Sequence, residues 1–499
     1  MTAESREITG SSSGAVGGSV GFDPAKARSI LSRLIQLAIP TIVGTTSLTV
    51  MQFIDGWLVS LLDRQGIDGG VNLAASFNGG LTAFVPLALC FGVAGLVNTF
   101  VAQYVGDGRP ETGVRFAWQG IWLSIFSIPI FVILALGMGD IFRLFGHSGD
   151  LLRLETLFAR YMLATAPINF AGLVIGSFFL GLHKPVIQVV AGVVGNIVNL
   201  VLDYALIFGN FGCPALHLLG AAIATLTASI VSLVILLVFF FRWQRKMRIP
   251  IKKASPIRFS EMVKLIKVGL PAGAQLSGDI FCWTIFTLAW VDHFGPAAAE
   301  AQSAVMRYVT ISFMPAVGLG NAVTALVANR IGAKDQAGAI KTANWGILLA
   351  IGYMGLCGLI FWLGRATLAG VFLSRPQSLH IAEAILIFSA IFQIFDAMNV
   401  IFVSALRGAG DTVIPSVITL GSAISICVIG GGVVTLNQPQ FGVSGPWTMA
   451  TIYICFSGLA NLFWWTTGRW KRINLLGDHI PAVTESPDKI HAKANRSAE

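Results

Sequence analysis

Twelve apolar segments, each longer than the roughly 20 residues that a helix needs to cross a bilayer, divide this chain. Only 11% of its 499 residues are charged. A soluble protein carries about 25% charged residues, and a compact soluble chain with so few could not cover its surface. The segments span residues 31–62, 71–104, 114–138, 152–181, 186–209, 216–241, 262–291, 297–331, 338–364, 379–406, 412–436 and 443–468. The sequence therefore predicts an all-α integral membrane protein with twelve transmembrane helices.

The basic residues indicate how the chain is oriented in the membrane. The net charge of +9 is spread over short loops between apolar segments, so it predicts no nucleic-acid surface. Loops on the amino-terminal side hold 22 Lys and Arg residues, and the opposite loops hold five. Because loops rich in Lys and Arg stay in the cytoplasm, we expect a multi-pass protein of the cell membrane with both termini cytoplasmic.

The chain also repeats itself at an offset of 226 to 227 residues. The matches place Val101–Gly106 on Val327–Gly332, Gly181 on Gly408, Asn169 on Asp396 and Arg242 on Arg469. Each copy contains six segments, an even number, so both copies enter the membrane in the same orientation. The repeat therefore predicts two six-helix lobes, related by a pseudo-twofold axis along the membrane normal, with a cleft between them. This architecture is typical of alternating-access carriers and is less consistent with a channel.

Repeat and composition together predict five parts. They are a disordered cytoplasmic tail over 1–29, an N-terminal lobe over 30–245, a cytoplasmic connector over 246–260, a C-terminal lobe over 261–474 and a second disordered tail over 475–499.

Acidic and amide residues in the first lobe form the leading candidate for an ion site. A charge at the centre of a lipid-facing helix costs about 2.5–3.5 kcal/mol, so Asp55 and Asp203 are expected to face the interior. Asn196, Asn199 and Asp203 recur on one helix face. Their oxygens suit a small cation, or hydrogen bonds to a protonated acid, although amides also join helices. Pro40 removes a backbone hydrogen bond and is the predicted hinge of the first helix.

The second lobe has its own pair of acids, Asp279 and Asp396. Phe392 lies four residues before Asp396, and Trp283 lies four residues after Asp279. A carboxylate beside aromatic faces suits an organic cation, although such aromatics are also common in helix packing. Arg307 falls inside a predicted span, and we expect it to pair with one of the two acids.

Several function classes lack the residues that they need. The apolar segments contain no HExxH, GxSxG or GxxxxGK motif. Its seven histidines lie at span ends, in loops or in the tail, and its six cysteines form no CxxC pair. We therefore predict neither an enzyme nor an ATP-driven pump, and no cofactor beyond a coupling ion.

With these features the chain resembles the MATE family, the multidrug and toxic compound extrusion antiporters. The similar stretches are Ile39-Pro40, Phe53-Ile-Asp55, Phe100–Gly106, Gly220–Thr225, Gly269-Leu-Pro271, Ala301-Gln302, Met314-Pro315 and Leu406–Asp411. The resemblance covers residues 30 to 470, and it rests on the order and spacing of the stretches rather than on one motif.

The resemblance implies site residues as well as a fold. It places Asp55, Asn199, Asp203 and Thr225 at first-lobe cation positions, where Asp55, Asn199 and Asp203 could hold Na⁺. In the second lobe it places Asp279 and Asp396 at acidic positions of the NorM-like branch. We add Gln302, Phe392 and Arg307 as further candidate cation or substrate residues of this lobe. Three departures concern that lobe: Asp at 279 is commonly Glu, Phe392 replaces a frequent Tyr, and Arg307 is an unexpected charge.

We therefore predict a secondary transporter that exports cationic amphipathic drugs or metabolites by alternating access, in exchange for H⁺ or Na⁺. Its expected partners are a small organic cation and the lipid bilayer, and it is expected to be a monomer. The alternative is a flippase for lipid-linked precursors or oligosaccharides from the same wider superfamily. A large anionic substrate would call for several Arg or Lys residues in the cavity, and only Arg307 is evident.

Overall fold

The computed structural model describes residues 24–62, 69–144, 147–373 and 375–476, which form helices and turns without strands. The first half contains α1 (Pro24–Ser60), α2 (Gly69–Gly106), α3 (Pro110–Phe126), α4 (Ile128–Leu144), α5 (Gly149–Gly181), α6 (Pro185–Phe208), α7 (Leu218–Lys246) and the short α8 (Ile251–Ala254). The second half contains α9 (Phe259–Ile285), α10 (Pro296–Gly332), α11 (Gln336–Leu363), α12 (Arg365–Phe372), α13 (Pro376–Ala409), α14 (Val413–Ser422), α15 (Gly431–Asn437) and α16 (Ser444–Thr466). Two π-helical segments, η2 (Phe286–Val291) and η4 (Ala423–Gly430), extend α9 and α14.

Proline and glycine mark several helix ends. Pro185, Pro296 and Pro376 open α6, α10 and α13, where a missing N–H costs no helical hydrogen bond. Gly209 (φ 76°) and Gly410 (φ 93°) end α6 and α13 in the left-handed region, which only glycine enters without strain. The local sequence thus fixes where these helices turn.

Ten helical segments of the described residues are long and apolar enough to cross a membrane. The two predicted segments outside this set coincide with α9 and α16. Both are long helices, but α9 contains Asp279 and Pro271, and α16 contains many small and polar residues. All twelve predicted segments are therefore helical, and ten of them also qualify as spans by length and composition.

The structure shifts three predicted boundaries. Helix α1 begins at Pro24, so the predicted tail over 1–29 includes helical residues, and residues 1–23 lie outside the described part. The connector predicted over 246–260 includes α8 and the first residues of α9. Leu475, predicted to begin a disordered tail, is only 6% exposed.

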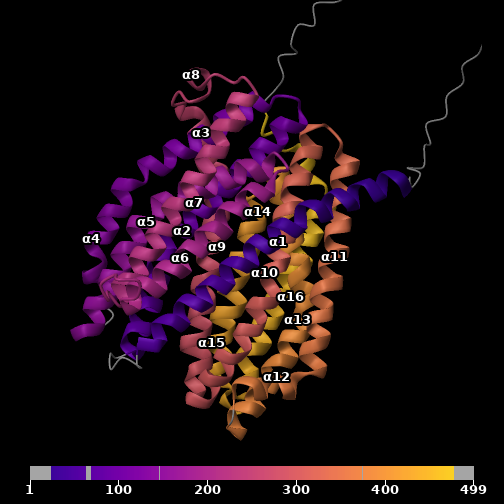
Figure 1. The fold of residues 1–499 in the computed structure, drawn as a ribbon. Helices are drawn as coiled ribbons and strands as arrows, with labels where there is room; N and C mark the ends of the chain where they lie inside the picture. Colours follow the sequence, from indigo (N-terminus) through magenta and orange to yellow (C-terminus); the bar gives the residue numbers. More distant parts are fainter. Residues whose placement is uncertain (1–23, 63–68, 145–146, 374, 477–499) are drawn as a thin grey trace, which may run out of the picture.

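The helices pack as two bundles. In the first bundle (α2–α7), α5 contacts α2, α3, α4 and α7, and α6 contacts α7. In the second bundle (α9–α16), α13 contacts α10, α11 and α16, and α14 contacts α9 and α16. Figure 1 shows the purple and magenta helices of the first bundle beside the orange and yellow helices of the second.

Helix α1 belongs to both bundles. Leu34 and Leu37, before Pro40, lie in a hydrophobic cluster with residues of α10, α11 and α13. Leu58 and Val59, near the other end, lie in a cluster with residues of α6 and α7. In Figure 1 the helix runs obliquely across the molecule, as this division requires. The predicted hinge residue Pro40 therefore lies within a continuous helix, between a half that packs on one bundle and a half that packs on the other.

Backbone contacts join the bundles from the middle of α2 to the face where α2 and α10 end and α8 lies, which we call the connector face. A Cβ atom at Gly92 of α2 would lie 2.1 Å from the backbone nitrogen of Gly273 in α9. A Cβ at Gly106 would lie 2.0 Å from the carbonyl oxygen of Asn329, and one at Gly332 would lie 1.9 Å from that of Gln103. Only glycine permits such approaches, so the bundles are closed on this face.

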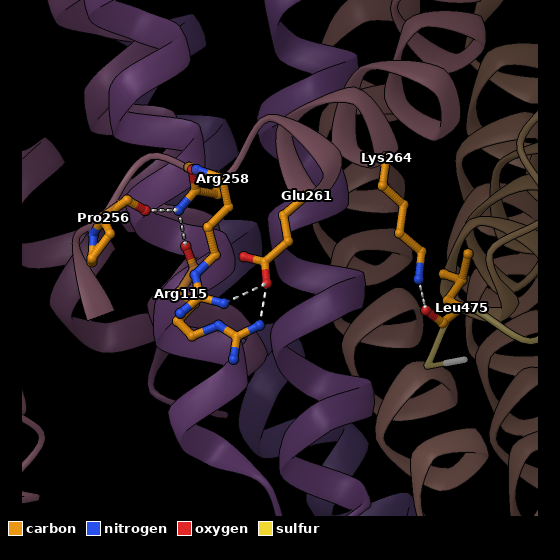
Figure 2. Close-up of polar contacts among 7 residues, drawn as sticks. Arg115, Pro256, Arg258, Glu261, Lys264 and Leu475 are labelled. Atoms are coloured by element: carbon orange, nitrogen blue, oxygen red, sulfur yellow. Dashed lines mark hydrogen bonds and ion pairs between the residues drawn. The ribbon is translucent and has the colours of Figure 1, made fainter. Parts of the chain in front are cut away.

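Polar contacts reinforce the closure of the connector face (Figure 2). Glu261 of α9 forms an ion pair with Arg115 of α3, and Arg258 lies 4.0 Å from the same carboxylate. Lys264 of α9 donates a hydrogen bond to the carbonyl oxygen of Leu475. The side chain of Leu475 lies in the cluster that contains Phe100 of α2. Contacts from α9 and from the end of the described chain thus hold this face of the first bundle.

Candidate functional site

The first candidate site lies between α1 and α6. The Asn199 amide faces both acids, and its orientation is assigned from their acceptor oxygens: with the nitrogen on that side it donates to Asp55 Oδ1 at 2.9 Å and to Asp203 Oδ2 at 3.1 Å. Asn199 and Asp203 are fully buried, and Asp55 is half-buried. The two carboxyl groups lie close enough to interact electrostatically. The structure therefore brings together three of the four predicted first-lobe residues.

One carboxylate oxygen of this site has no hydrogen-bond donor among the described residues. Asp203 Oδ1 is enclosed and receives no hydrogen bond from any residue that the structure describes. A buried acceptor without a donor is costly, and a proton or a small cation would satisfy it. These residues are thus a candidate site for the uptake and release of a positive charge between two helices.

The other predicted first-lobe residues have different roles. Asn196 Nδ2 donates to Ser47 Oγ at 2.9 Å and so joins α6 to α1 beside the acids. The Thr225 hydroxyl donates to the carbonyl oxygen of Ala221 in its own helix, α7, at 3.0 Å. A cation-binding role for Thr225 stays a prediction.

The second candidate site contains Asp279 of α9 and Asp396 of α13. The Tyr453 hydroxyl, from α16, donates a hydrogen bond of 2.7 Å to Asp279 Oδ1. Tyr453 is 3% exposed. Asp396 is half-buried and lies within electrostatic range of Asp279. The acids from the two helices are thus neighbours, as the sequence suggested, and a tyrosine that the sequence analysis missed is the hydroxyl partner of one.

The three remaining second-lobe predictions fall outside this acid pair. Phe392 is 1% exposed and stacks on Trp447, so in this conformation it belongs to the core. Gln302 accepts a hydrogen bond from Trp447 Nε1 at 3.0 Å and donates one to Thr287 at 3.2 Å. Both residues support the packing of α16 against the rest of its bundle.

Arg307 does not make the contact that we expected. It is an exposed residue, and its guanidinium lies 5.8 Å from the centre of the Phe372 ring. The ion pairs of the described residues join it to neither Asp279 nor Asp396. The sequence placed Arg307 at the right depth in a helix but could not show which side of the helix it occupies.

A further buried acid, Asp411, lies outside the spans in the turn between α13 and α14. Burial raises the pKa of Asp411, opposed by hydrogen bonds from Trp464 Nε1 at 2.7 Å and from the backbone of Ile414. This acid has its partners within the protein, so it ties the turn to α16 and is not a candidate ion site.

Comparison with known proteins identifies the family. The model of the MatE family matches residues 40–205 and 280–431. The probable multidrug resistance protein NorM of Thermotoga maritima is 26% identical over 378 residues, which are 74% of this chain and 80% of that protein. The multidrug resistance protein NorM of Vibrio cholerae is 25% identical over 390 residues, 76% of this chain and 82% of that protein.

Solved structures share the fold. An outward-facing multidrug resistance MATE transporter of the MOP superfamily superposes with a TM-score of 0.77 at 19% identity, covering 90% of this chain and 98% of that one. The eukaryotic MATE transporter AtDTX14 superposes with a TM-score of 0.77 at 19% identity, covering 89% and 97%.

Proposed function

This chain belongs to the MatE family, and on that premise we propose that it exports cationic amphipathic compounds in exchange for H⁺ or Na⁺. The names of its NorM relatives support multidrug efflux, and the two acidic sites support coupling to a cation. The observation that carries the proposal is the Asn199 amide bridging Asp55 of α1 and Asp203 of α6. A cation taken up there would change how α1 is held against the first bundle.

The contacts of α1 provide a route from this site to the second bundle. The Thr41 hydroxyl donates to the Gly318 carbonyl oxygen of α10 at 2.7 Å, and the Thr45 hydroxyl donates to that of Met314 at 3.1 Å. Pro40 immediately precedes this pair, at a point where α1 lacks one backbone hydrogen bond. Binding couples to closure only if the cation binds more tightly in one conformation than in the other.

We also propose the topology of the transporter. It has twelve spanning helices in two six-helix lobes, related by a pseudo-twofold axis along the membrane normal. The connector face carries the basic loops, which favours a cytoplasmic location for this face and for both termini. Because the bundles are closed on this face, we propose that the structure represents an outward-facing state and that the carrier is a monomer.

The test uses purified protein in liposomes loaded with the ethyl ester of rhodamine B, a fluorescent organic cation. A pH gradient and a Na⁺ gradient are imposed separately on the parent, Asp55→Asn and Asp396→Asn. Asn196→Ala is the matched control, because Asn196 joins the same two helices without contacting the acids.

We expect one gradient to drive the dye, with at least a tenfold loss in Asp55→Asn and little loss in Asn196→Ala. Loss in Asp396→Asn alone would move coupling to the second bundle. If neither gradient moves the dye across membranes that contain correctly inserted parent protein, the proposal is wrong.

A further inference from the structure

Arg407, near the end of α13, is a half-buried cation that the proposed coupling sites do not use. Its Nη2 donates a hydrogen bond to Gln275 Oε1 of α9 at 3.0 Å. Its Nε is enclosed and has no hydrogen-bond partner among the described residues. The ion pairs of those residues involve other arginines. The enclosed Nε has lost water without gaining an acceptor, which is costly unless a ligand supplies one.

The internal repeat shows that the fold does not require this charge. The offset that places Gly181 on Gly408 places Leu180 on Arg407. Leu180 is 6% exposed and packs in the cluster of α10, α11 and α13 residues. A branched apolar side chain therefore fills the equivalent position in the first bundle. The positive charge at Arg407 calls for an explanation other than helix packing.

Arg407 lies where the two bundles meet. Its backbone carbonyl accepts a hydrogen bond of 3.1 Å from the Thr99 hydroxyl of α2. The next carbonyl, that of Gly408, accepts one of 2.9 Å from Gln103 Nε2. These contacts belong to the closed connector face, so separation of the bundles there would expose the guanidinium to the cytoplasmic opening.

Gln275, the partner of Arg407, also relates the guanidinium to the second acid site. Gln275 and Asp279 are four residues apart on α9 and so share one helix face. With a rise of 1.5 Å per residue, their backbones are about 6 Å apart along the helix. Asp279 lies one turn beyond Gln275 on α9, and Asp396 lies on α13. Asp396 precedes Arg407 by 11 residues, about 16 Å along the helix. The wall of the second bundle thus carries a positive group nearer the connector face and two acids further from it.

We propose that Arg407 binds the carboxylate of a zwitterionic organic substrate that enters from the connector face, with the cationic end of the substrate toward Asp279 and Asp396. Guanidinium groups pair with carboxylates through two parallel hydrogen bonds, and the unused Nε is one of the donors needed. The inference rests on the proposed export function and assigns to Arg407 the recognition of a carboxylate on the substrate.

The experiment measures binding of two matched dyes to detergent-solubilised protein by fluorescence anisotropy. Rhodamine B carries a free carboxylate and is a zwitterion, whereas its ethyl ester is a plain cation. At equilibrium, dye binding shifts the protein toward the conformation that binds the dye. Binding can therefore be measured although the connector face is closed in this structure. The proteins are the parent, Arg407→Leu, which installs the residue of the other repeat, and Arg407→Lys, which keeps the charge.

Arg407→Leu should raise the Kd for rhodamine B about tenfold and leave the Kd for the ester within about twofold, and Arg407→Lys should recover part of the loss. Equal weakening of both dyes would assign Arg407 a structural role and overturn the inference. Unchanged binding of rhodamine B in Arg407→Leu, or a parent that binds the ester but not the zwitterion, would overturn it too. The binding measurement needs no ion gradient, so failure of coupled export in liposomes is a separate result.

Discussion

Replacing Gly92 by alanine should open the connector face. The added Cβ would lie 2.1 Å from the backbone nitrogen of Gly273 and 2.5 Å from the carbonyl oxygen of Gly269. Ordinary contact begins at 3.4 Å, so α2 and α9 must separate by about 1.3 Å at this point. The clashing atoms are backbone atoms, which cannot rotate away as a side chain can.

The free-energy cost of Gly92→Ala in the closed arrangement follows from the overpacking that the added methyl group causes. Overpacking of a close contact costs about 1–3 kcal/mol, and the better helix propensity of alanine cancels because α2 is helical in both states. A cost of about 1–3 kcal/mol in the closed arrangement shifts the equilibrium between closed and open connector faces by about 5- to 150-fold. Gly95→Ala is the matched control, because a Cβ at Gly95 of the same helix meets no atom within 4 Å.

The assay is a distance measurement between two spin labels by pulsed electron paramagnetic resonance. The labels replace Glu111 of α3 and Gln336 of α11, two exposed residues at the connector face, in a variant without the six native cysteines. Gly92→Ala should add a population at longer distance, and Gly95→Ala should match the parent. Identical distance distributions in the two variants would refute the reasoning that glycine contacts hold this face closed.

Two further substitutions test the packing of the second bundle. Tyr453→Phe removes the hydroxyl that donates to Asp279 and should lower the stability of the protein by about 1 kcal/mol, measured as a lower melting temperature. The control is Asp279→Asn, which keeps an acceptor for the hydroxyl and should lower the melting temperature less. Gly410→Ala places a Cβ at φ 93° and 2.5 Å from Leu475, and should destabilise the protein by about 1–3 kcal/mol. Gly212→Ala, also at positive φ but without neighbours, separates the two causes: an equal loss of melting temperature in both variants would mean that contact with Leu475 contributes nothing.

Much of the fold could be predicted because hydropathy and helix length depend on local sequence. Part of the first acid site could also be predicted from local sequence, because the spacing of Asn199 and Asp203 places them on one helix face. Asp55 could be added because a charge in an apolar helix must face the interior. The structure supplies what spacing lacks, namely that α1 and α6 are neighbours and that one amide bridges both acids.

The errors in the second bundle have a common physical cause. Phe392 and Gln302 lie at the depth in the membrane that a substrate site would need. Their positions around the helix axis, however, direct both side chains into the core beside Trp447. Rotation places Arg307 on an exposed side instead. Tyr453 was missed because a tyrosine in an aromatic-rich helix carries no local sign that its hydroxyl meets an acid on another helix. Such pairings depend on tertiary packing, which periodicity does not encode.

The division of α1 between the two bundles bears on how the protein is made. Synthesis proceeds from the amino terminus, so α1 is the first of the described helices to leave the ribosome. Leu34 and Leu37 nevertheless pack against α10, α11 and α13, which are completed only after most of the chain has been translated. The first half of α1 must therefore wait in the membrane without its final neighbours. The first half of α1 is thus among the last of the described parts to be fixed, and the two repeats cannot mature as independent units.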